Sequence, residues 1–340
     1  MKIAILSEKT FNGYIPKSFI ENLQWDIYLQ KVLKAYHISY YCDNFNNINF
    51  NYYDIIIAIP PKNNPDLEHI FKKISKETTL IAMQEGSKDH WLNLPIKKQM
   101  TFINAMNYCA AILCPNEMDT IFYKGIFKCP VYKFTTFTDT LQIESFGNLE
   151  HQKKIPKSMI IGANFDWRGY GLPAVYAGSG IIKNYGIPTM REDIAKDNDL
   201  FVKEMLNSNA TLYPYVNQSK WLQILNKYQI AIHLSNESAT GQFQIQCACL
   251  GIPCVGNKEL TMQKYLFPDL SIDSWDIQTA NTLIKKLIHD KTYYNYVVKK
   301  AYKNVSNLDT IVELPNFLKI LEKIYKDHNK IHKRILRFMF

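Results

Sequence analysis

The stretch SNESATGQFQIQCACLGIPCVGN, which spans Ser235 to Asn257, carries the clearest fold signal in this 340-residue chain. An apolar run at 230–234 precedes it and predicts a buried strand, and a polar loop follows that run. Small and apolar residues from Gln242 to Leu250 then predict a helix, and Gly-Ile-Pro turns the chain into a short strand at 254–256. A strand, a helix and a second strand in this order predict a parallel β-α-β unit.

The same alternation continues in both directions along the chain. Strand patterns recur at 3–6, 39–42, 55–59, 80–84, 111–114 and 131–134, and again at 159–162, 187–190, 211–213, 230–234, 254–255 and 270–272. Helical patterns lie between several of them, at 27–35, 66–75 and 99–108. Two such series predict an α/β fold with two Rossmann-like domains, each built on a parallel sheet that helices cover on both faces.

A polar segment at 144–157, ESFGNLEHQKKIPK, interrupts the pattern and predicts the linker between the domains. We expect domains over 1–150 and 151–310 that face a central cleft, where open α/β sheets bind their ligands. The remaining segment, 311–340, is basic and amphipathic. It predicts a helix that either packs back across the domains or binds a membrane surface or phosphates.

Composition narrows the class of protein. The formal net charge is +9, which permits a polyanionic partner or a membrane surface without requiring one. The seven cysteines include no C-x-x-C pair, which argues against a disulfide framework and a zinc site. The first apolar run is too short for a signal peptide, and no apolar segment is long enough to span a bilayer. We therefore expect a soluble, cytoplasmic protein.

A glycine-rich loop follows the strand at 159–162, in the sequence SMIIGANFDWRGYGLPAVYAG. Gly162 comes at the end of the strand, and Arg168 and Gly169 lie in the loop before a helix of small residues. Loop amides and a helix N-terminus form an anion site, and an arginine there can clamp a diphosphate. The pattern is not G-x-G-x-x-G, so it does not specifically indicate a dinucleotide fold, and a simple turn is the alternative.

Two further strand ends carry polar candidates. Tyr215 and Val216 follow Pro214, and because proline stops the strand ladder, backbone groups there can read the edge of a nucleobase. An ordinary strand exit is the alternative. Glu237 lies just past the strand at 230–234, where a carboxylate can accept hydrogen bonds from sugar hydroxyls.

The helix that follows Glu237 adds a second group of candidates. Thr240, Gly241 and Gln242 lie at its start, where free backbone amides favour an anion. Gln246 falls on the same face as Gln242, one turn later, and can reach a ribose hydroxyl.

The first predicted domain has two polar loops at strand ends. Asn12 and Gly13 lie in SEKTFNGY, where they can bring the backbone close to phosphates or to an acceptor. The loop QEGSKDHW offers Glu85, Asp89 and His90 directly after a buried strand. Either loop can also be a plain solvated turn.

The order of these elements resembles the donor domain of GT-B nucleotide-sugar glycosyltransferases. That family shows an acid, a glycine four residues later, a second acid on the helix and then Gly-x-Pro-Val-Val. The matching residues here are Glu237, Gly241, Gln246 and the run Gly251 to Val255. Gln246 replaces the second acid, and its spacing from Glu237 is one residue longer than in the retaining E-x7-E families, so the stereochemistry stays open. Residues 111–134 resemble the last unit of the acceptor domain and are similar to phage and environmental glycosyltransferases.

The resemblance implies a transferase that moves a sugar from a nucleotide-sugar, most simply a UDP-sugar, to an acceptor hydroxyl. It implies an acceptor domain over 1–150 and a donor domain over 151–310, with Glu237 holding the transferred sugar. It implies no cofactor and no metal, since the family stabilises the leaving diphosphate with protein groups. A phage glucosyltransferase of this fold has its catalytic acid at a similar strand end, which makes Glu85 the first candidate base and Asp89 the second.

Several alternatives stay open. The charge and the phage resemblance suggest a hydroxymethylated base in DNA as the acceptor, flipped out of the stack, although no DNA-binding motif is present. Surface saccharides, lipids or proteins are other acceptors, with the basic tail then associating with a membrane. A nucleotide-sugar 2-epimerase, a sugar receptor and a non-catalytic nucleotide-sugar-binding protein are alternative functions on a similar fold.

Overall fold

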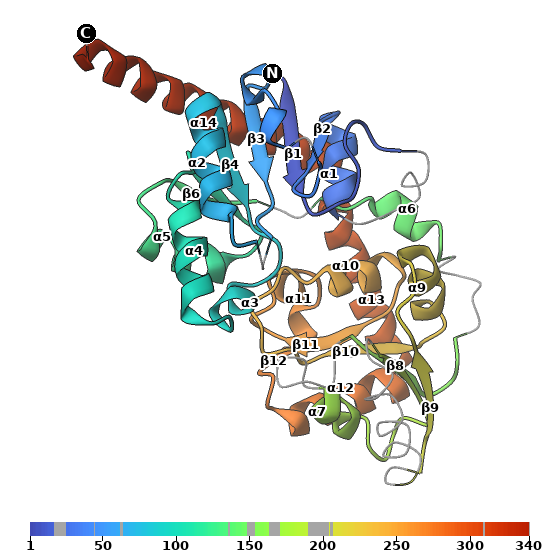
Figure 1. Cartoon of the computed structure of the whole chain (residues 1–340). Coiled ribbons are helices and arrows are strands. Elements are labelled where there is room, and N and C mark those ends of the chain that lie inside the picture. The colour runs from blue at the N-terminus through green and yellow to red at the C-terminus, as the bar shows by residue number, and fades with distance from the viewer. Residues whose placement is uncertain are drawn as a thin grey trace. The chain divides into compact units, whose positions relative to one another are not determined.

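The computed structural model describes residues 1–16, 25–43, 45–61, 64–134, 137–147, 154–162, 171–189, 204, 207–308 and 310–339. The chain forms two compact units, one of residues 1–137 together with 310–340 and one of residues 138–309 (Figure 1). Each unit is built on a six-stranded sheet, and every strand pair in both sheets is parallel. The predicted α/β fold with two Rossmann-like domains is therefore confirmed.

The N-terminal unit has the strand order β2-β1-β3-β4-β5-β6. The strands are apolar and fully buried in most positions, as in the Ile-Ile-Ile-Ala run of β3, because helices cover both faces of the sheet. Their bounds are β1 Ile3–Ser7, β2 Tyr36–Ser39, β3 Ile55–Ala58, β4 Thr79–Met83, β5 Ala111–Cys114 and β6 Val131–Lys133. The helices are α1 Trp25–Leu33, α2 Leu67–Glu77, α3 Asp89–Leu92, α4 Ile96–Met106, α5 Glu117–Ile126 and α14 Thr310–Met339, with short 3₁₀ turns at Phe45–Asn47 and Phe50–Tyr52.

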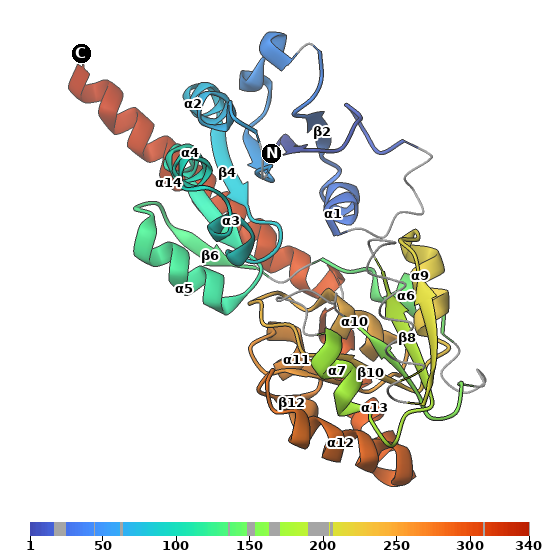
Figure 2. The same cartoon turned by 60° about the horizontal axis from the view of Figure 1, so that its bottom comes forward.

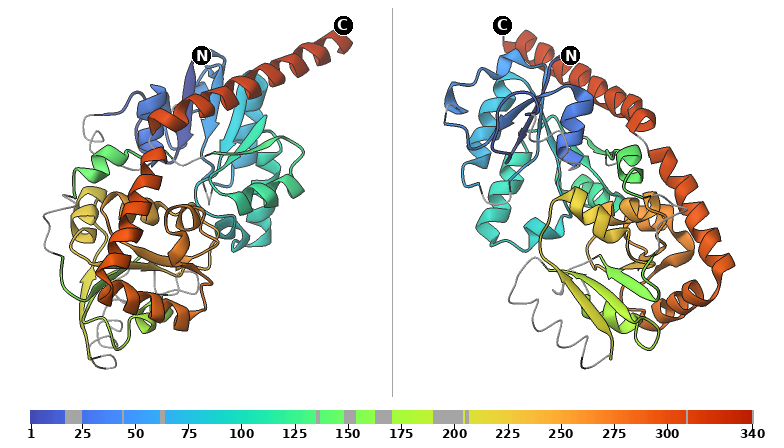
Figure 3. Two further views of the ribbon diagram at one scale, coloured as in Figure 1. Left: turned by 180° about the vertical axis from the view of Figure 1, so that it is seen from behind. Right: turned by 90° about the vertical axis from the view of Figure 1, so that its right-hand side faces the viewer.

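Helix α14, the last of the chain, returns to the N-terminal unit and crosses one face of its sheet (Figure 3). Phe317, Leu321 and Ile324 are buried there in one cluster with Ile57 and Ile81. Their spacing of four and three residues places them on one face of the helix, which is the amphipathic pattern read from the sequence. This part of α14 thus packs onto the sheet of the N-terminal unit.

The second unit has the strand order β12-β11-β10-β7-β8-β9. Its strands β8, β10 and β12 are labelled in Figure 2. Its strands are β7 Ser158–Ile161, β8 Asn184–Pro188, β9 Asn209–Tyr213, β10 Ile230–His233, β11 Cys254–Asn257 and β12 Ser271–Ile272. Its helices are α6 Thr140–Glu144, α7 Gly171–Ala177, α9 Gln218–Leu225, α10 Gln242–Cys249, α11 Thr261–Leu266, α12 Ile277–His289 and α13 Lys291–Val305, with 3₁₀ turns at Pro268–Leu270 and Ser306–Leu308. Residues 138–147, which the sequence places before the domain boundary, belong to this unit.

The strand orders fix where ligands are expected. In the second unit the chain runs from β7 to β8 and β9 on one side, and continues with β10, β11 and β12 on the other. The strand order therefore reverses between β7 and β10, and in the N-terminal unit it reverses between β1 and β3. Open α/β sheets bind ligands at such points, outside the carboxyl ends of the strands.

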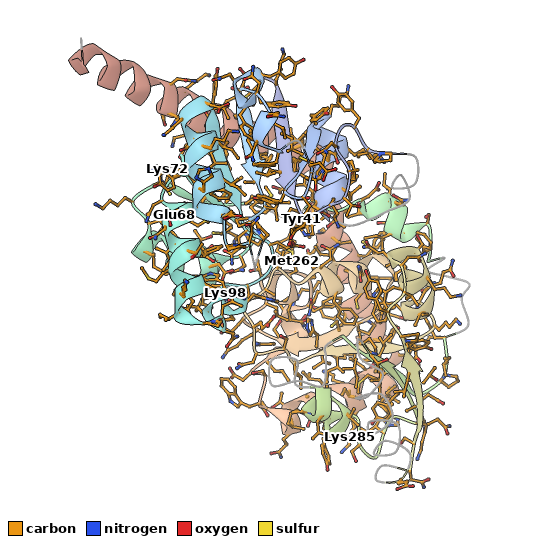
Figure 4. The ribbon with its side chains drawn as sticks, in the orientation of Figure 1. Tyr41, Glu68, Lys72, Lys98, Met262 and Lys285 are labelled. Atoms are coloured by element: carbon orange, nitrogen blue, oxygen red, sulfur yellow. The ribbon has the colours of Figure 1, made fainter. Side chains whose placement is uncertain are left out.

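All twelve predicted strands are present, but two of them are displaced along the chain. Strand β2 covers Tyr36–Ser39 instead of 39–42, because the chain turns at Cys42, whose N–H bonds the Ser39 carbonyl, and Tyr41 points to solvent with 60% exposure (Figure 4). Strand β8 covers Asn184–Pro188 instead of 187–190, and it includes Gly186, which weakened the strand pattern. That glycine packs against the Tyr228 ring, where a Cβ would lie 2.5 Å from Cζ.

Within the described residues, no helix is both long and apolar enough to cross a membrane.

Candidate functional site

The first part of the candidate site is the β7–β10 switch point of the second unit. Gly162 follows β7 and its N–H donates to the Ile232 carbonyl of β10 at 2.8 Å. A Cβ at Gly162 would lie 2.5 Å from Cδ1 of Phe243, which belongs to the first turn of α10. The glycine therefore lets α10 approach the sheet closely at this point. Arg168 and Gly169, predicted in the loop that follows, lie outside the described residues.

The start of α10 is set by Gly241, its N-terminal cap. The φ of Gly241 is 95°, and a Cβ there would lie 2.9 Å from Gln244 Oε1 and 3.0 Å from Met262 Cβ. Positive φ and close packing both require glycine at this position. The Thr240 carbonyl accepts from the Met262 N–H at 2.9 Å, so the loop is anchored to α11. No side chain caps α10, which leaves its first turn suited to an anion.

The two predicted glutamines of α10 both contact other side chains. Gln242 accepts from the Thr138 hydroxyl at 3.4 Å, and Gln246 Oε1 accepts from Trp221 Nε1 at 3.1 Å. Because the indole N–H is a donor only, this contact fixes the orientation of the Gln246 amide. The amide N–H₂ of Gln246 is then the group suited to a ligand hydroxyl, and its side chain is only 6% exposed.

His233, which the sequence did not single out, ends β10 beside Glu237. Its Nδ1 accepts from Gln244 Nε2 at 3.0 Å, so the ring proton is on Nε2. Burial lowers the pKa of His233 to about 4, against a smaller opposing effect of the Glu237 carboxylate. The imidazole is therefore neutral at pH 7. The signal that could have found it is a polar residue that closes the apolar run Ile230-Ala231-Ile232.

The neutral state of His233 predicts a pH dependence of stability. Its pKa is about 4 in the folded chain and ~6.5 when unfolded, so the unfolded chain binds more protons between these values. Stability that is present above pH 6.5 is lost as the pH falls toward 4. We expect the free energy of unfolding to drop between pH 7 and pH 5 by about 2 kcal/mol more in the native chain than in His233→Gln. Urea unfolding at the two pH values measures this, and equal drops in both proteins would contradict it.

The strand exit after β9 leads directly into α9. Tyr215 is 74% exposed and Val216 is half-buried. Asn217 then caps α9, its Oδ1 accepting from the Lys220 N–H at 2.8 Å. Tyr215 and Val216, the predicted base-reading residues, thus follow the carboxyl end of β9. This strand belongs to the same sheet as β10, which precedes α10, and lies two strands from β7.

In the N-terminal unit, the loop after β1 is bound to β2. The Gly13 N–H and carbonyl pair with the carbonyl and N–H of His37, each at 2.9 Å, and Asn12 Oδ1 accepts from the Ser39 N–H at 2.8 Å. His37 Nδ1 donates to the Phe11 carbonyl at 2.6 Å and its Nε2 accepts from the Ser7 hydroxyl at 2.8 Å. Burial lowers the pKa of His37, so its ring is neutral, and its hydrogen bond to Phe11 anchors the loop after β1 to β2. The backbone of Gly13 and the side-chain oxygen of Asn12 are thus hydrogen-bonded to β2 within the N-terminal unit.

The loop after β4 borders a cavity of about 430 Å³ that we call the β3–β4 cavity. Side chains from the loop after β3, the loop after β4, α3 and the first turns of α4 line it, and Glu85 and His90 are among them. Asp89 instead accepts from the Ser87 hydroxyl at 2.6 Å and pairs with Lys88 Nζ at 3.3 Å. Fully buried Asp119, another residue that the sequence did not single out, anchors the loop by accepting from the Lys88 N–H at 3.0 Å.

Metal ligands do not gather in the described part of the chain. No group of three or more His, Cys, Asp or Glu side chains there is placed to hold a metal ion. The sequence also contains an Asp-x-Asp pattern, Asp197-Asn198-Asp199, whose two carboxylates are oxygen ligands of the kind that Mg²⁺ binds, and it lies outside the described residues. Metal independence therefore stays a prediction.

Solved structures with the same architecture match almost the whole chain. Anabaena HepE in complex with UDP-glucose has a TM-score of 0.70 and 12% identity, over 95% of this chain and 100% of that chain. An alpha-glucosyltransferase in complex with UDP and a 13-mer DNA containing an HMU base has a TM-score of 0.65 and 14% identity, over 95% and 99%. Sucrose-phosphate synthase from Thermosynechococcus elongatus has a TM-score of 0.64 and 9% identity, over 99% and 100%.

No protein-family model and no curated protein sequence matches the chain. The likeness therefore rests on three-dimensional structure. The chain has the GT-B glycosyltransferase fold.

Proposed function

We propose that this protein is a glycosyltransferase that moves a sugar from a UDP-sugar to a hydroxyl group of an acceptor. The observation that carries the proposal is the β7–β10 switch point, where an uncapped helix beginning after Gly241 lies beside Glu237 and the amide of Gln246. An anion site, a carboxylate and an amide in one place are the groups that a nucleoside diphosphate sugar requires. Similar structures that hold UDP or UDP-glucose support the choice of donor.

Each donor-site residue has a role in this proposal. The backbone amides at the start of α10 and Arg168 bind the diphosphate, and Gln246 binds a ribose hydroxyl. Backbone groups at Tyr215 and Val216 read the base, and Glu237 accepts from hydroxyls of the transferred sugar. No metal is assigned a role.

Glu85 is the better candidate base of the two acids in the N-terminal unit. Asp89 accepts from Ser87 and pairs with Lys88, and it is not among the side chains that line the β3–β4 cavity. Glu85 is exposed and lines the β3–β4 cavity. In the transfer, the acceptor oxygen bonds to the anomeric carbon and the bond from that carbon to the diphosphate breaks. The electron pair leaves with UDP, and the hydroxyl proton passes to Glu85.

Arg168 provides the first test of the donor site. We expect Arg168→Ala to weaken UDP-glucose binding by about 1.5–3 kcal/mol, because it removes a hydrogen bond between charged groups. Lys285→Ala is the matched control, since it removes an exposed positive charge from α12 of the same unit (Figure 4). Isothermal titration with UDP and UDP-glucose measures both variants, and an unchanged dissociation constant for Arg168→Ala would remove this arginine from the site.

The same experiments separate the alternative functions. A 2-epimerase converts the nucleotide-sugar without an acceptor, which product analysis detects. A non-catalytic protein binds UDP-glucose without releasing UDP. Hydroxymethylated DNA stays a predicted acceptor, supported by the net charge of +9 and by a similar structure that holds a DNA containing an HMU base.

A further inference from the structure

Helix α14 runs along the N-terminal sheet from the carboxyl ends of its strands to their amino ends. Near the start of the helix, Phe317 packs against Phe134, which follows the carboxyl end of β6, with ring centroids 6.0 Å apart. Further along, His328 Nδ1 lies in a hydrogen bond 3.2 Å from the hydroxyl of Thr79, the first residue of β4. The helix is therefore antiparallel to the strands that it covers.

The last turns of α14 extend past the sheet. From Phe317 to His328 the helix advances about 16 Å, which is the length of a five-residue strand such as β4. His328 is thus at the amino edge of the sheet, and the helix continues to Met339 for about another 16 Å. Figures 1 and 3 both show this end of the helix beyond the strands. We call residues 329–339 the terminal turns.

The terminal turns have an apolar sector and a basic sector. At 3.6 residues per turn, five apolar residues fall within an arc of about 160° around the helix axis, together with His332. The apolar residues are Ile331, Ile335, Leu336, Phe338 and Met339. Four cationic residues fall within an arc of about 100° on the other side. They are Lys330, Lys333, Arg334 and Arg337. No Asp or Glu is present between residues 328 and 340.

The apolar sector continues the face that α14 buries on the sheet. Phe317, Leu321 and Ile324 are buried there at a spacing of four and three residues. Ile331 follows Ile324 after seven residues, and Ile335 follows four residues later, so both lie in register with the buried face. The sheet covers this face up to its amino edge, and the same face continues where the sheet has ended. It therefore requires a different partner in the terminal turns.

The two sectors together indicate the chemistry of that partner. A second copy of the helix would bring two sets of four cations together, and no acid in this segment would offset them. A nucleic acid would neutralise the cations but would leave the apolar sector in water. A bilayer with anionic headgroups accepts both sectors, since apolar side chains enter the acyl boundary while Lys and Arg lie among the headgroups.

We propose that the terminal turns of α14 bind an anionic membrane surface. The helix lies in the plane of the interface, with its apolar sector in the acyl boundary and its basic sector among the lipid phosphates. The segment is at the opposite end of the N-terminal unit from the loop that carries Glu85, so membrane binding does not compete with that loop. The proposal is independent of the proposed glycosyltransferase function, because none of these residues belongs to the donor site.

Vesicle binding tests the proposal. Sedimentation with vesicles of phosphatidylcholine alone is compared with vesicles of phosphatidylcholine and phosphatidylglycerol in equal parts, at low salt. We expect the full chain to bind the anionic vesicles about 100-fold or more tightly, because each Lys or Arg near such a surface contributes about fivefold. This preference should decrease as added salt shortens the screening length from about 10 Å at 0.1 M to about 3 Å at 1 M.

Charge variants locate the basic sector. We expect Lys333→Glu/Arg337→Glu to lower the affinity for anionic vesicles by about 25-fold or more, because it reverses two charges of this sector. Lys299→Glu/Lys303→Glu is the matched control. It reverses two exposed lysines at the same spacing on α13, and its affinity should stay within about twofold of the native value.

A third variant tests the apolar sector. Ile335→Ser/Phe338→Ser keeps every charge but removes two apolar side chains, so we expect vesicle affinity to fall by about 10-fold or more. Far-UV circular dichroism verifies that each variant retains its helices, and titration with UDP should give the native dissociation constant in all three.

Two vesicle results would overturn the proposal: equal affinity for neutral and anionic vesicles, or native affinity in Lys333→Glu/Arg337→Glu. Dimerisation in solution that Ile335→Ser/Phe338→Ser abolishes would assign the apolar sector to a second copy instead. Binding of duplex DNA that only the Lys333→Glu/Arg337→Glu variant loses would assign the basic sector to a nucleic acid. Absence of UDP-glucose binding bears on the proposed function alone and leaves the membrane result standing.

Discussion

Replacing Glu237 by glutamine is expected to lower turnover by about 100- to 1,000-fold while the dissociation constant of UDP changes by less than about twofold. The carboxylate follows β10 beside the start of α10, where we propose that it accepts from two hydroxyls of the transferred sugar. Contacts to the reacting group act mainly in the transition state, so their loss lowers turnover more than affinity for the nucleotide. Steady-state kinetics with saturating UDP-glucose and titration with UDP measure the two quantities.

Glu259→Gln is the matched control for this variant. Glu259 is an exposed acid just past β11, at the same edge of the same sheet, and it has no assigned role. Turnover of that variant should stay within about twofold of the native value. A collapse of UDP affinity in Glu237→Gln, with turnover preserved at saturation, would instead place Glu237 in the nucleotide pocket.

Gly162→Ala is expected to lower the free energy of unfolding by about 3 kcal/mol, the upper end of the range for an overpacked interior. The added methyl group would lie 2.5 Å from Cδ1 of Phe243. That ring has little room to move, since Trp221 and His233 contact it with ring centroids at 6.4 Å and 5.6 Å. The φ of Gly162 is not positive, so the loss reports packing alone.

Gly125→Ala is the control for packing. Gly125 lies in α5, and a Cβ there meets nothing within 4 Å. Alanine should therefore stabilise that helix by about 0.5–1 kcal/mol. Denaturant unfolding compares the two variants. A decrease in the free energy of unfolding below about 1 kcal/mol in Gly162→Ala would show that the Phe243 ring moves aside to make room for the methyl group.

Most of the strands were predictable because they are apolar runs buried on both faces. Runs such as Ile55 to Ala58 and Ile230 to Ile232 have no polar alternation, as expected for central strands of a parallel sheet. The glycine that opens α10 was predictable too, because its position between a polar loop and a helix demands special backbone geometry. Where aromatic residues continued the pattern, as at Tyr40 and Tyr41, the predicted strand ran past its true end.

The remaining parts of the site depend on contacts between distant residues. Trp221 and Gln246 are 25 residues apart, and nothing local indicates that one fixes the amide of the other. The β3–β4 cavity combines side chains from residue 60 to residue 102, so its two lysines, Lys97 and Lys98, appeared in the sequence only as part of a diffuse charge. The amphipathic pattern of the tail indicated a buried face but not which sheet it covers.

The return of α14 has a consequence for biosynthesis. One face of the N-terminal sheet, including Ile57 and Ile81, is covered in part by Phe317, Leu321 and Ile324. A ribosome makes the sheet long before it makes this cover, and domains otherwise tend to fold in the order of their synthesis. The second unit has all of its strands and helices by residue 308 and can close first. The strands of the N-terminal unit therefore leave the ribosome before those of the second unit, and part of the apolar face of their sheet stays uncovered until α14 is made.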